Sequence, residues 1–267
     1  MNDRPIGIFD SGVGGLTVLQ ALRERLPAES FLYLGDTARL PYGSKSATTV
    51  RRYALNAAAH LAAHDVKLLV VACNTASSEA LDELTEASPV PVVGVVEPGV
   101  RAGLATGAGR IGVIGTEGTI RSGAYRRALA RLAPATGVRA TACPLFVPLA
   151  EEGWGDHPVT DEIARHYLGP LLEWGAEALI LACTHYPLLR PSLQRVVGAD
   201  VALVDSASSV AESVIGDHPE LVDASPGETG SVHIELTDAS ERFLRILRAI
   251  LGRDPEHLEV VDIEGVA

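Results

Sequence analysis

Cys73 and Cys183 are the residues of this sequence whose type and position suggest chemistry. Each follows a short apolar run and precedes short polar residues, as Cys73-Asn74-Thr75 and as Cys183-Thr184-His185. Each also comes before a segment predicted to be helical, and a helix N-terminus favours the thiolate over the thiol. Two thiols on opposite walls of a cleft can remove a proton from one face of a carbon and return one to the other. The pair therefore predicts acid–base chemistry that inverts a stereocentre.

Cysteine also has less reactive roles. It is a common small residue of protein cores, and Cys143, in Ala142-Cys143-Pro144, is interpreted in that way. A thiol redox centre is the competing interpretation of the other two, but the C-x-x-C motif usual for it is absent from the sequence. Three cysteines, an odd number and far apart, favour neither a disulfide framework nor a zinc motif. They fit a reducing compartment.

Three further motifs are present in part. The Asp-Ser-Gly of residues 10–12 resembles that of aspartic proteases, whose mechanism needs two such carboxylates in an all-β fold. The glycines of residues 107–112 match the dinucleotide fingerprint but precede a predicted strand instead of following one. His60 and His64 lie four residues apart on a predicted helix, but Leu61 replaces the glutamate of the metalloprotease motif. A solvated or packed helix face is the interpretation of that pair.

Short apolar runs alternate with amphipathic stretches along the chain. Buried strands are predicted at residues 6–9, 31–34, 68–72, 92–96, 111–114, 179–182 and 201–204. Helices are predicted at residues 16–26, 48–64, 78–84, 118–132, 163–174, 188–197 and 239–251. This alternation is typical of βα units, so the sequence predicts an α/β fold with mostly parallel sheets.

Two segments recur in the same order in the two halves of the chain. Residues 6–8 are echoed 105 residues later by residues 111–113, and residues 69–75 are echoed 110 residues later by residues 179–185. Buried strands resemble one another, so short matches also arise by chance. Two similar offsets that both end in polar loops favour a duplication. We therefore expect two pseudosymmetric parallel-sheet α/β domains, with the active site in the cleft between them.

The domain boundaries follow from the position of the second copy. Glycine- and proline-containing segments precede it, so we expect the second domain at residues 98–206. Residues 1–97 and 207–267 are then expected to form a discontinuous first domain. The tail would return to this domain through the predicted helix and a strand at residues 258–261. Residues 217–231, rich in Gly, Pro, Glu and Asp, are predicted to be an exposed loop.

Composition excludes several classes of protein. With 267 residues, 47% hydrophobic and 21% charged, the chain is expected to fold into one or two ordinary domains. A net charge of −12 argues against nucleic acid and acidic membranes as general partners. No apolar segment approaches the roughly 18 residues of a membrane span, and the N-terminus has no signal-peptide pattern. The expectation is a cytoplasmic protein.

Six motifs occur in order along the chain, and together they closely resemble those of bacterial glutamate racemases. They are Phe9-Asp10-Ser11-Gly12-Val13-Gly14-Gly15-Leu16, Gly35-Asp36-Thr37, Pro41-Tyr42-Gly43, Ala72-Cys73-Asn74-Thr75-Ala76-Ser77, Pro144-Leu145-Phe146-Val147-Pro148 with Glu151-Glu152-Gly153, and Cys183-Thr184-His185-Tyr186-Pro187-Leu188. The resemblance, to members of the aspartate/glutamate racemase superfamily, extends from about residue 5 to about residue 215. It implies interconversion of L- and D-glutamate, often in homodimers, to supply D-glutamate for peptidoglycan.

Matched residue by residue, the resemblance implies roles in the site. Cys73 would be the base acting on D-glutamate, and Cys183 the base acting on L-glutamate. Asp10 would assist Cys73, whereas Glu152 and His185 would assist Cys183. The substrate-binding residues that it implies are Asp10, Ser11, Pro41, Tyr42, Gly43, Asn74, Thr75, Thr116, Thr119, Thr184 and His185.

The assisting residues also have simpler interpretations. Asp10 and His185 could each only cap the helix that follows. The sequence does not decide which of Glu151 and Glu152 points inward, and either could be a solvated loop charge.

The resemblance implies that no cofactor takes part, and lysine usage agrees with it. The sequence contains only Lys45 and Lys67, so a Schiff base with pyridoxal phosphate has few candidates. No metal site is expected either. Within enzymes, the alternative is racemisation of aspartate or a hydantoin on the same scaffold. A non-catalytic two-domain binding protein could share the architecture, but it would need neither thiol.

Overall fold

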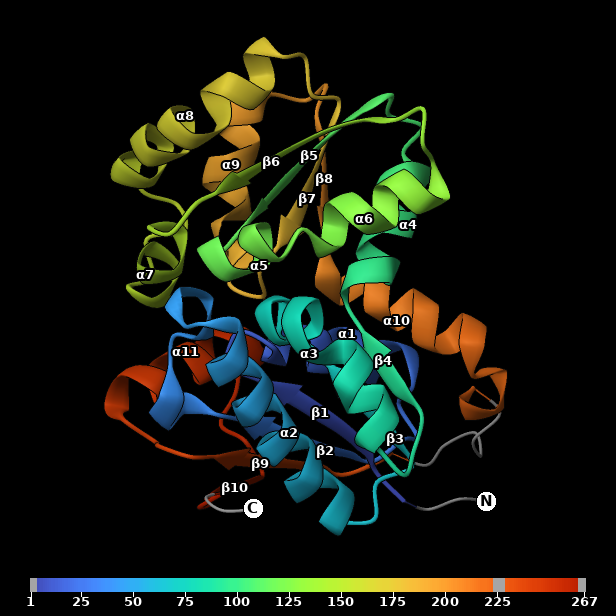
Figure 1. Cartoon of the computed structure of the whole chain (residues 1–267). Coiled ribbons are helices and arrows are strands. Elements are labelled where there is room, and N and C mark those ends of the chain that lie inside the picture. Colours follow the sequence, from blue (N-terminus) through green and yellow to red (C-terminus); the bar gives the residue numbers. More distant parts are fainter. Residues whose placement is uncertain (1–3, 223–228, 264–267) are drawn as a thin grey trace.

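The computed structural model describes residues 4–222 and 229–263 of the chain. It contains two parallel sheets, each between two layers of helices, so the predicted α/β fold is confirmed. Figure 1 shows the two sheets in two lobes. We call the lower lobe, which contains β1 and β10, the first lobe and the upper one the second lobe.

The first sheet has six strands within the described residues. Their order is β10 (His257–Val260), β9 (Val232–Leu236), β2 (Phe31–Gly35), β1 (Ile6–Asp10), β3 (Leu68–Val71) and β4 (Val92–Gly94). One face is covered by α1 (Leu16–Arg25), α10 (Ser206–Asp217) and α11 (Glu241–Leu251), and the other by α2 (Ala47–Ala63) and α3 (Asn74–Ala87). Burial on both faces explains the apolar sequences of the central strands.

The second sheet has four strands within the described residues. Their order is β6 (Gly137–Ala142), β5 (Arg110–Gly115), β7 (Ala178–Ala182) and β8 (Ala202–Asp205). One face is covered by α4 (Val96–Ala105) and α6 (Ala124–Leu132), and the other by α7 (Phe146–Glu151), α8 (Pro158–Glu173) and α9 (Arg190–Val197). The short helix α5 (Glu117–Ser122) lies at the junction with α3 of the first lobe.

The two lobes share one strand order. The sequence β2-β1-β3-β4 in the first sheet corresponds to β6-β5-β7-β8 in the second, and all of these neighbours are parallel. The two sequence echoes fall on β1 with β5 and on β3 with β7. Cys73 and Cys183 therefore follow equivalent strands, at the carboxyl edge where parallel sheets bind their ligands.

The helices α4 and α10 connect the lobes and pack against each other. α4 also packs on α6 and β7, whereas α10 packs on α1. The boundaries expected at residues 98 and 207 fall within these two helices. The division of the chain into domains there stays a prediction.

Several predicted elements have different ends in the structure. The strand expected at residues 92–96 ends at Gly94, because Val96 already begins α4. The helix expected at residues 118–132 is divided into α5 and α6 by Gly123, whose φ of 71° is the left-handed conformation that favours glycine. A 3-10 turn, η3 (Tyr186–Leu189), separates Cys183 from α9, so the second cysteine does not directly begin an α-helix.

Several elements were not predicted. The strands β6 and β9 read Gly-Val-Arg-Ala-Thr-Ala and Val-His-Ile-Glu-Leu, so polar residues interrupt the apolar pattern used to find strands. β9 pairs with β2, and β10, near the strand expected at residues 258–261, pairs with β9. The expected loop at residues 217–231 contains the 3-10 turn η4 (Pro219–Leu221), and its residues 223–228 lie outside the described residues.

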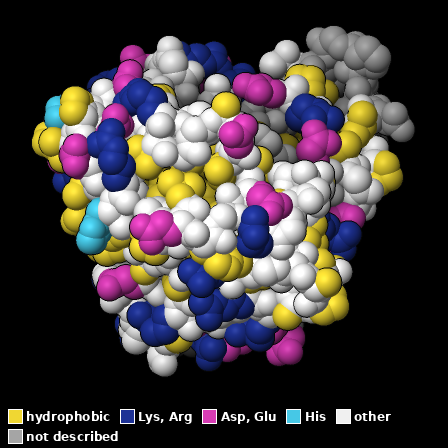
Figure 2. Space-filling view, turned by 90° about the horizontal axis from the view of Figure 1, so that it is seen from above, with side chains coloured by type: hydrophobic (Ala, Val, Ile, Leu, Met, Phe, Trp, Pro, Cys, Tyr) yellow, Lys and Arg dark blue, Asp and Glu magenta, His cyan; other side chains and the backbone are white. Residues whose placement is uncertain are grey.

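The surface carries charges of both signs. On the face seen from above in Figure 2, acidic and basic side chains are distributed among hydrophobic and neutral polar ones. Among the described residues, none of the helices combines the length and apolar character needed to cross a bilayer.

Gly35 and Gly169 provide a matched test of the fold. A Cβ at Gly35 would lie 2.4 Å from the carbonyl oxygen of Gly12, in the loop after β1, whereas one at Gly169 in α8 meets nothing within 4 Å. Gly35→Ala should lower the free energy of unfolding by about 1–3 kcal/mol through this clash. Gly169→Ala should raise it by up to about 1 kcal/mol because alanine favours helix. Urea unfolding followed by circular dichroism measures both, and equal stabilities would contradict the packing described.

Candidate active site

Both cysteines line one cavity between the lobes. Its volume is about 30 Å³. The residues that line it are Ser11, Leu40, Pro41, Tyr42, Gly43, Cys73, Asn74, Thr75, Thr116, Val147, Cys183, Thr184 and His185. Three residues expected in the site, Asp10, Thr119 and Glu152, are not among them.

Cys73 lies at the N-terminus of α3 and is 4% exposed. Its Sγ lies 3.4 Å from the Ser11 hydroxyl oxygen and accepts a hydrogen bond from the Ala76 N–H at 3.5 Å. Burial, together with the negative charge of Asp10, raises the pKa of the Cys73 thiol to about 12. Cys73 is therefore a thiol at neutral pH in this cavity.

Asp10 lies behind the cavity wall at the end of β1. Its Oδ2 accepts hydrogen bonds from the N–H groups of Gly12 at 3.0 Å and Gly15 at 3.1 Å. Its Oδ1 accepts a hydrogen bond of 3.4 Å from the Thr184 hydroxyl of the second lobe. Burial raises the pKa of Asp10 even though nearby His185 opposes the shift. The residue thus holds the loop before α1, as a capping role implies, and also contacts the other lobe.

His185 is buried beside Cys183. Its side chain makes no capping hydrogen bond to the first N–H groups of η3, so it does not cap that turn. Burial acts against the charged imidazolium, but the interactions with Cys183 and Glu151 outweigh it and raise the pKa of His185 to about 10. The imidazole Nε2 lies 3.5 Å from Glu151 Oε1. At neutral pH His185 is therefore a cation between a sulfur and a carboxylate.

The carboxylate that contacts His185 is Glu151, which corrects the expectation of Glu152. The Glu151 side chain is 13% exposed, whereas that of Glu152 is 50% exposed. Helical spacing explains the difference: Glu151 lies one turn after Val147, which lines the cavity, and Glu152 one turn after the exposed Pro148. The periodicity of α7 could have identified the inward carboxylate from the sequence.

Arg242 joins this carboxylate from the far end of the chain. Its guanidinium donates to Glu151 Oε2 at 2.9 Å and lies 3.1 Å from Glu152 Oε1. Arg242 belongs to α11 of the first lobe, and Glu151 to α7 of the second. No sequence motif pointed to this contact between residues 91 positions apart.

Three threonine hydroxyls meet where α3 faces α5. The Oγ1 atoms of Thr75 and Thr116 lie 2.9 Å apart, Thr75 and Thr119 3.2 Å, and Thr116 and Thr119 3.0 Å. Gly43 packs directly on Thr116, since a Cβ there would lie 2.5 Å from Thr116 Cβ. Thr119 does not line the cavity, but its hydroxyl contacts those of Thr75 and Thr116, which do.

Asn74 and Tyr42 line the cavity with their side-chain polar atoms already bound. The Asn74 carboxamide donates to Ser206 Oγ at 3.2 Å and accepts from the Tyr125 hydroxyl at 2.6 Å. The Tyr42 hydroxyl donates to Asp36 Oδ2 at 2.6 Å, and burial with the Asp36 charge raises its pKa, so the phenol stays neutral. Sequence motifs did not identify Tyr125 and Ser206, which position Asn74.

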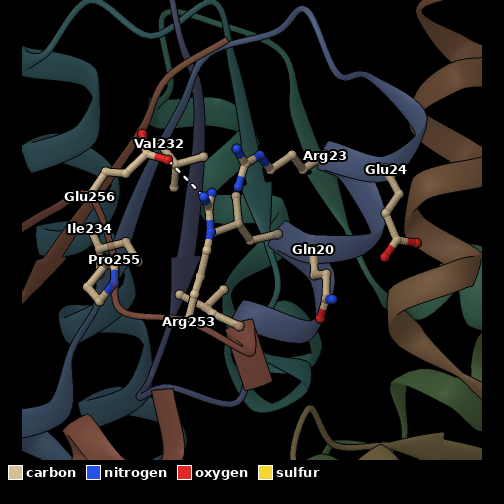
Figure 3. A pocket seen from close by; sticks show the side chains of 10 residues that line it. Gln20, Arg23, Glu24, Val232, Ile234, Arg253, Pro255 and Glu256 are labelled. Carbon is tan, nitrogen blue, oxygen red and sulfur yellow. Dashed lines mark ion pairs between the residues drawn. The ribbon is translucent and has the colours of Figure 1, made fainter. Parts of the chain in front are cut away.

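A larger cavity lies elsewhere, in the first lobe. Its volume is about 310 Å³, and it lies between α1, β9 and the segment that connects α11 to β10 (Figure 3). Arg253 and Glu256 form an ion pair of 3.0 Å at this cavity, beside the apolar side chains of Val232 and Ile234. None of the residues predicted for the site lines it, and it contains no thiol.

Comparison with known proteins agrees with the fold and the motifs. The family model described as Asp/Glu/Hydantoin racemase matches residues 6–214. A glutamate racemase of Geobacter metallireducens is 52% identical over 252 residues, 93% of each chain. The structure of a Bacillus anthracis glutamate racemase isoform superposes with a TM-score of 0.92 at 36% identity, covering 97% of each chain.

A further solved structure contains a ligand. The glutamate racemase of Francisella tularensis, in complex with D-glutamate, has a TM-score of 0.91 at 34% identity over 99% of each chain. The match of the family model covers most of the sequence, and the relatives align over nearly their whole length. The chain therefore belongs to the Asp/Glu/hydantoin racemase family.

Proposed function

We propose that this chain is a racemase that interconverts L- and D-glutamate, with Cys73 and Cys183 acting on opposite faces of the substrate α-carbon. The observation that carries the proposal is the shared cavity, which two buried thiols line from equivalent positions of two similar lobes. Similarity over nearly the full length to proteins named glutamate racemase supports glutamate as the substrate.

The chemistry requires stabilisation of negative charge. A thiol of ordinary pKa, about 8.5, is a far weaker base than the carbanion it would generate from an amino acid. The first N–H groups of α3 have no partner within the helix and suit the α-carboxylate, onto which the charge spreads. Ser11 and Thr75 line the cavity, and their hydroxyls are further candidate donors.

The two thiols differ in their electrostatic surroundings, and the difference defines the proton transfers. Burial and the charge of Asp10 hold Cys73 as a thiol, whereas Cys183 lies beside the imidazolium of His185. With L-glutamate, the Cys183 thiolate takes the α-proton, and the Cys73 thiol gives its proton to the opposite face to form D-glutamate. D-glutamate reacts with the reverse states, Cys73 as thiolate and Cys183 as thiol.

The substrate needs more space than this cavity offers. Its volume of about 30 Å³ is far below that of typical small-molecule sites, so we infer that the lobes separate to admit glutamate. Polar contacts between the lobes, such as that of Thr75 with Thr116, would then break, and water would bind these groups instead. Closure around glutamate would exclude water and strengthen its hydrogen bonds.

The proposal includes a reaction without a cofactor. Neither Lys45 nor Lys67 lines the cavity, so a pyridoxal phosphate Schiff base at the thiols finds no support. From the family resemblance we further propose a cytoplasmic homodimer that supplies D-glutamate for peptidoglycan synthesis.

Incubation in deuterium oxide tests the use of two bases. Because the thiol that donates to the product carries a solvent-derived proton, newly formed D-glutamate should contain deuterium at Cα while unreacted L-glutamate stays unlabelled at early times. Chiral chromatography with mass spectrometry measures both pools. Rapid labelling of L-glutamate before inversion would contradict the scheme. Parallel incubation with L-aspartate tests the substrate, and faster inversion of aspartate would exclude glutamate as the preferred one.

Serine substitutions separate the two reactive thiols from the third. Cys73→Ser and Cys183→Ser should each abolish measurable racemisation, because a serine hydroxyl ionises too weakly for either role. Cys143→Ser should retain most of the turnover, since Cys143 is buried in the second lobe and does not line the cavity. Circular dichroism confirms folding of each variant. Equal activities of the three variants would refute the assignment.

Glu151→Gln and Glu152→Gln test how His185 is controlled. The raised pKa of about 10 keeps His185 charged below that pH. Because the reaction is proposed to use the charged imidazolium, kcat/KM should fall as the pH rises through about 10 and His185 loses its proton. Loss of the Glu151 charge should lower this pKa and move the fall to lower pH. The loss of kcat/KM at neutral pH should stay below the roughly 100-fold expected for removal of an acid–base group itself.

Glu152→Gln is the matched control, since its side chain is half exposed and should leave the pH profile unchanged. The two enantiomers have equal free energies in water, so each variant must change kcat/KM equally in both directions. An identical pH profile for both variants would show that Glu151 does not position His185.

A further inference from the structure

His60 and His64 meet a buried carboxylate that is distant in the sequence. They lie one turn apart on α2, which covers the face of the first sheet near β9 in Figure 1. The His60 Nε2 lies 2.6 Å from Glu235 Oε2, and the His64 Nε2 lies 3.8 Å from Glu235 Oε1. Three potential ligand atoms of these side chains lie within 4.8 Å of one another.

Glu235 occupies a position where an apolar residue would be usual. It pairs with Leu34 of β2, and Leu34 belongs to the apolar layer between the first sheet and α2. Glu235 itself is buried, with only 4% of its surface exposed. Replacing such a buried charge by an apolar side chain is often neutral or stabilising, so packing alone does not explain a carboxylate here.

The two carboxylate oxygens of Glu235 face two imidazole rings. Oε2 lies nearest to His60 and Oε1 nearest to His64. This is a donor set that divalent zinc accepts.

The orientation of His64 also suits a ligand. Its Nδ1 lies 2.9 Å from the carbonyl oxygen of His60 and donates a hydrogen bond to it, which leaves a lone pair on Nε2. Metal-binding histidines are commonly oriented by such a hydrogen bond from the second ring nitrogen. The His64 side chain is 45% exposed, so an ion can reach the cluster from solvent and retain a water molecule.

We propose that His60, His64 and Glu235 form a site for one divalent transition-metal ion, with zinc as the best match. The ion takes the place of the proton shared by His60 and Glu235, which passes to solvent. The ligand atoms then adjust to separations of about 3.3 Å, as tetrahedral zinc requires. The bound ion links α2 to β9 and stabilises the attachment of the C-terminal strands to the first lobe.

The site is separate from the cavity that contains the thiols. None of its three ligands lines that cavity. Zinc bound there should therefore raise the melting temperature and leave racemisation unaffected, whereas zinc captured by Cys73 or Cys183 would inhibit it.

Calorimetric titration of the metal-free full-length chain, without an affinity tag, tests the proposal with zinc sulfate as the probe. We expect one equivalent of zinc in the wild type and in His166→Ala, a control histidine on the exposed side of α8. The affinity should fall at least about tenfold in His64→Ala, since even an outer partner of a metal ligand is worth that much. Cobalt substitution should give the visible absorption of a tetrahedral site without sulfur-to-metal charge transfer.

Two further variants keep the outcome decisive. Glu235→Gln should also weaken binding, and if it does not fold, His64→Ala decides because that side chain is half exposed. Cys73→Ser should retain the zinc equivalent. Equal affinity in the wild type and His64→Ala, absence of zinc binding in the wild type, or binding lost only in Cys73→Ser would overturn the proposal.

Discussion

The buried charge of Asp10 is the interaction on which the cavity depends. Its carboxylate is stabilised by two backbone N–H groups of its own loop and by Thr184 of the other lobe. From this position it disfavours ionisation of Cys73 and favours the imidazolium of His185. One carboxylate excluded from water thus acts on acid–base groups of both lobes. Its effect is large because the surrounding protein screens charge poorly.

The lobes meet at the cavity through polar contacts, whereas their apolar cores lie on the faces of the separate sheets. The threonine cluster, the Asn74 carboxamide and the Asp10–Thr184 hydrogen bond all cross the junction. Hydrogen bonds of this kind each contribute about 0.5–1.5 kcal/mol because water replaces them when they open. Separation of the lobes at this edge therefore costs much less than exposure of a core, which suits a site that must admit and release a small molecule.

The sequence predicted those features that local patterns determine. Central strands were recognisable because burial on both faces requires apolar runs, and the strand-end position of Cys73 and Cys183 followed from them. β9 was missed because His233 and Glu235 interrupt its pattern, and helical spacing could have distinguished Glu151 from Glu152. The contacts of Tyr125, Ser206 and Arg242 depend on how distant elements pack, and no local pattern encodes them.

The link from Arg242 to Glu151 makes the two similar lobes chemically unequal. The two lobes share one strand order, yet the ionic surroundings of Cys183 include a cation from α11, which has no counterpart among the described helices of the second lobe. The shared strand order places a thiol at the same strand end of each lobe, but the electrostatic settings of the two thiols differ. The second lobe on its own would keep Cys183 and lose Arg242, the distant cation that binds Glu151, so its acid–base group depends on the first lobe.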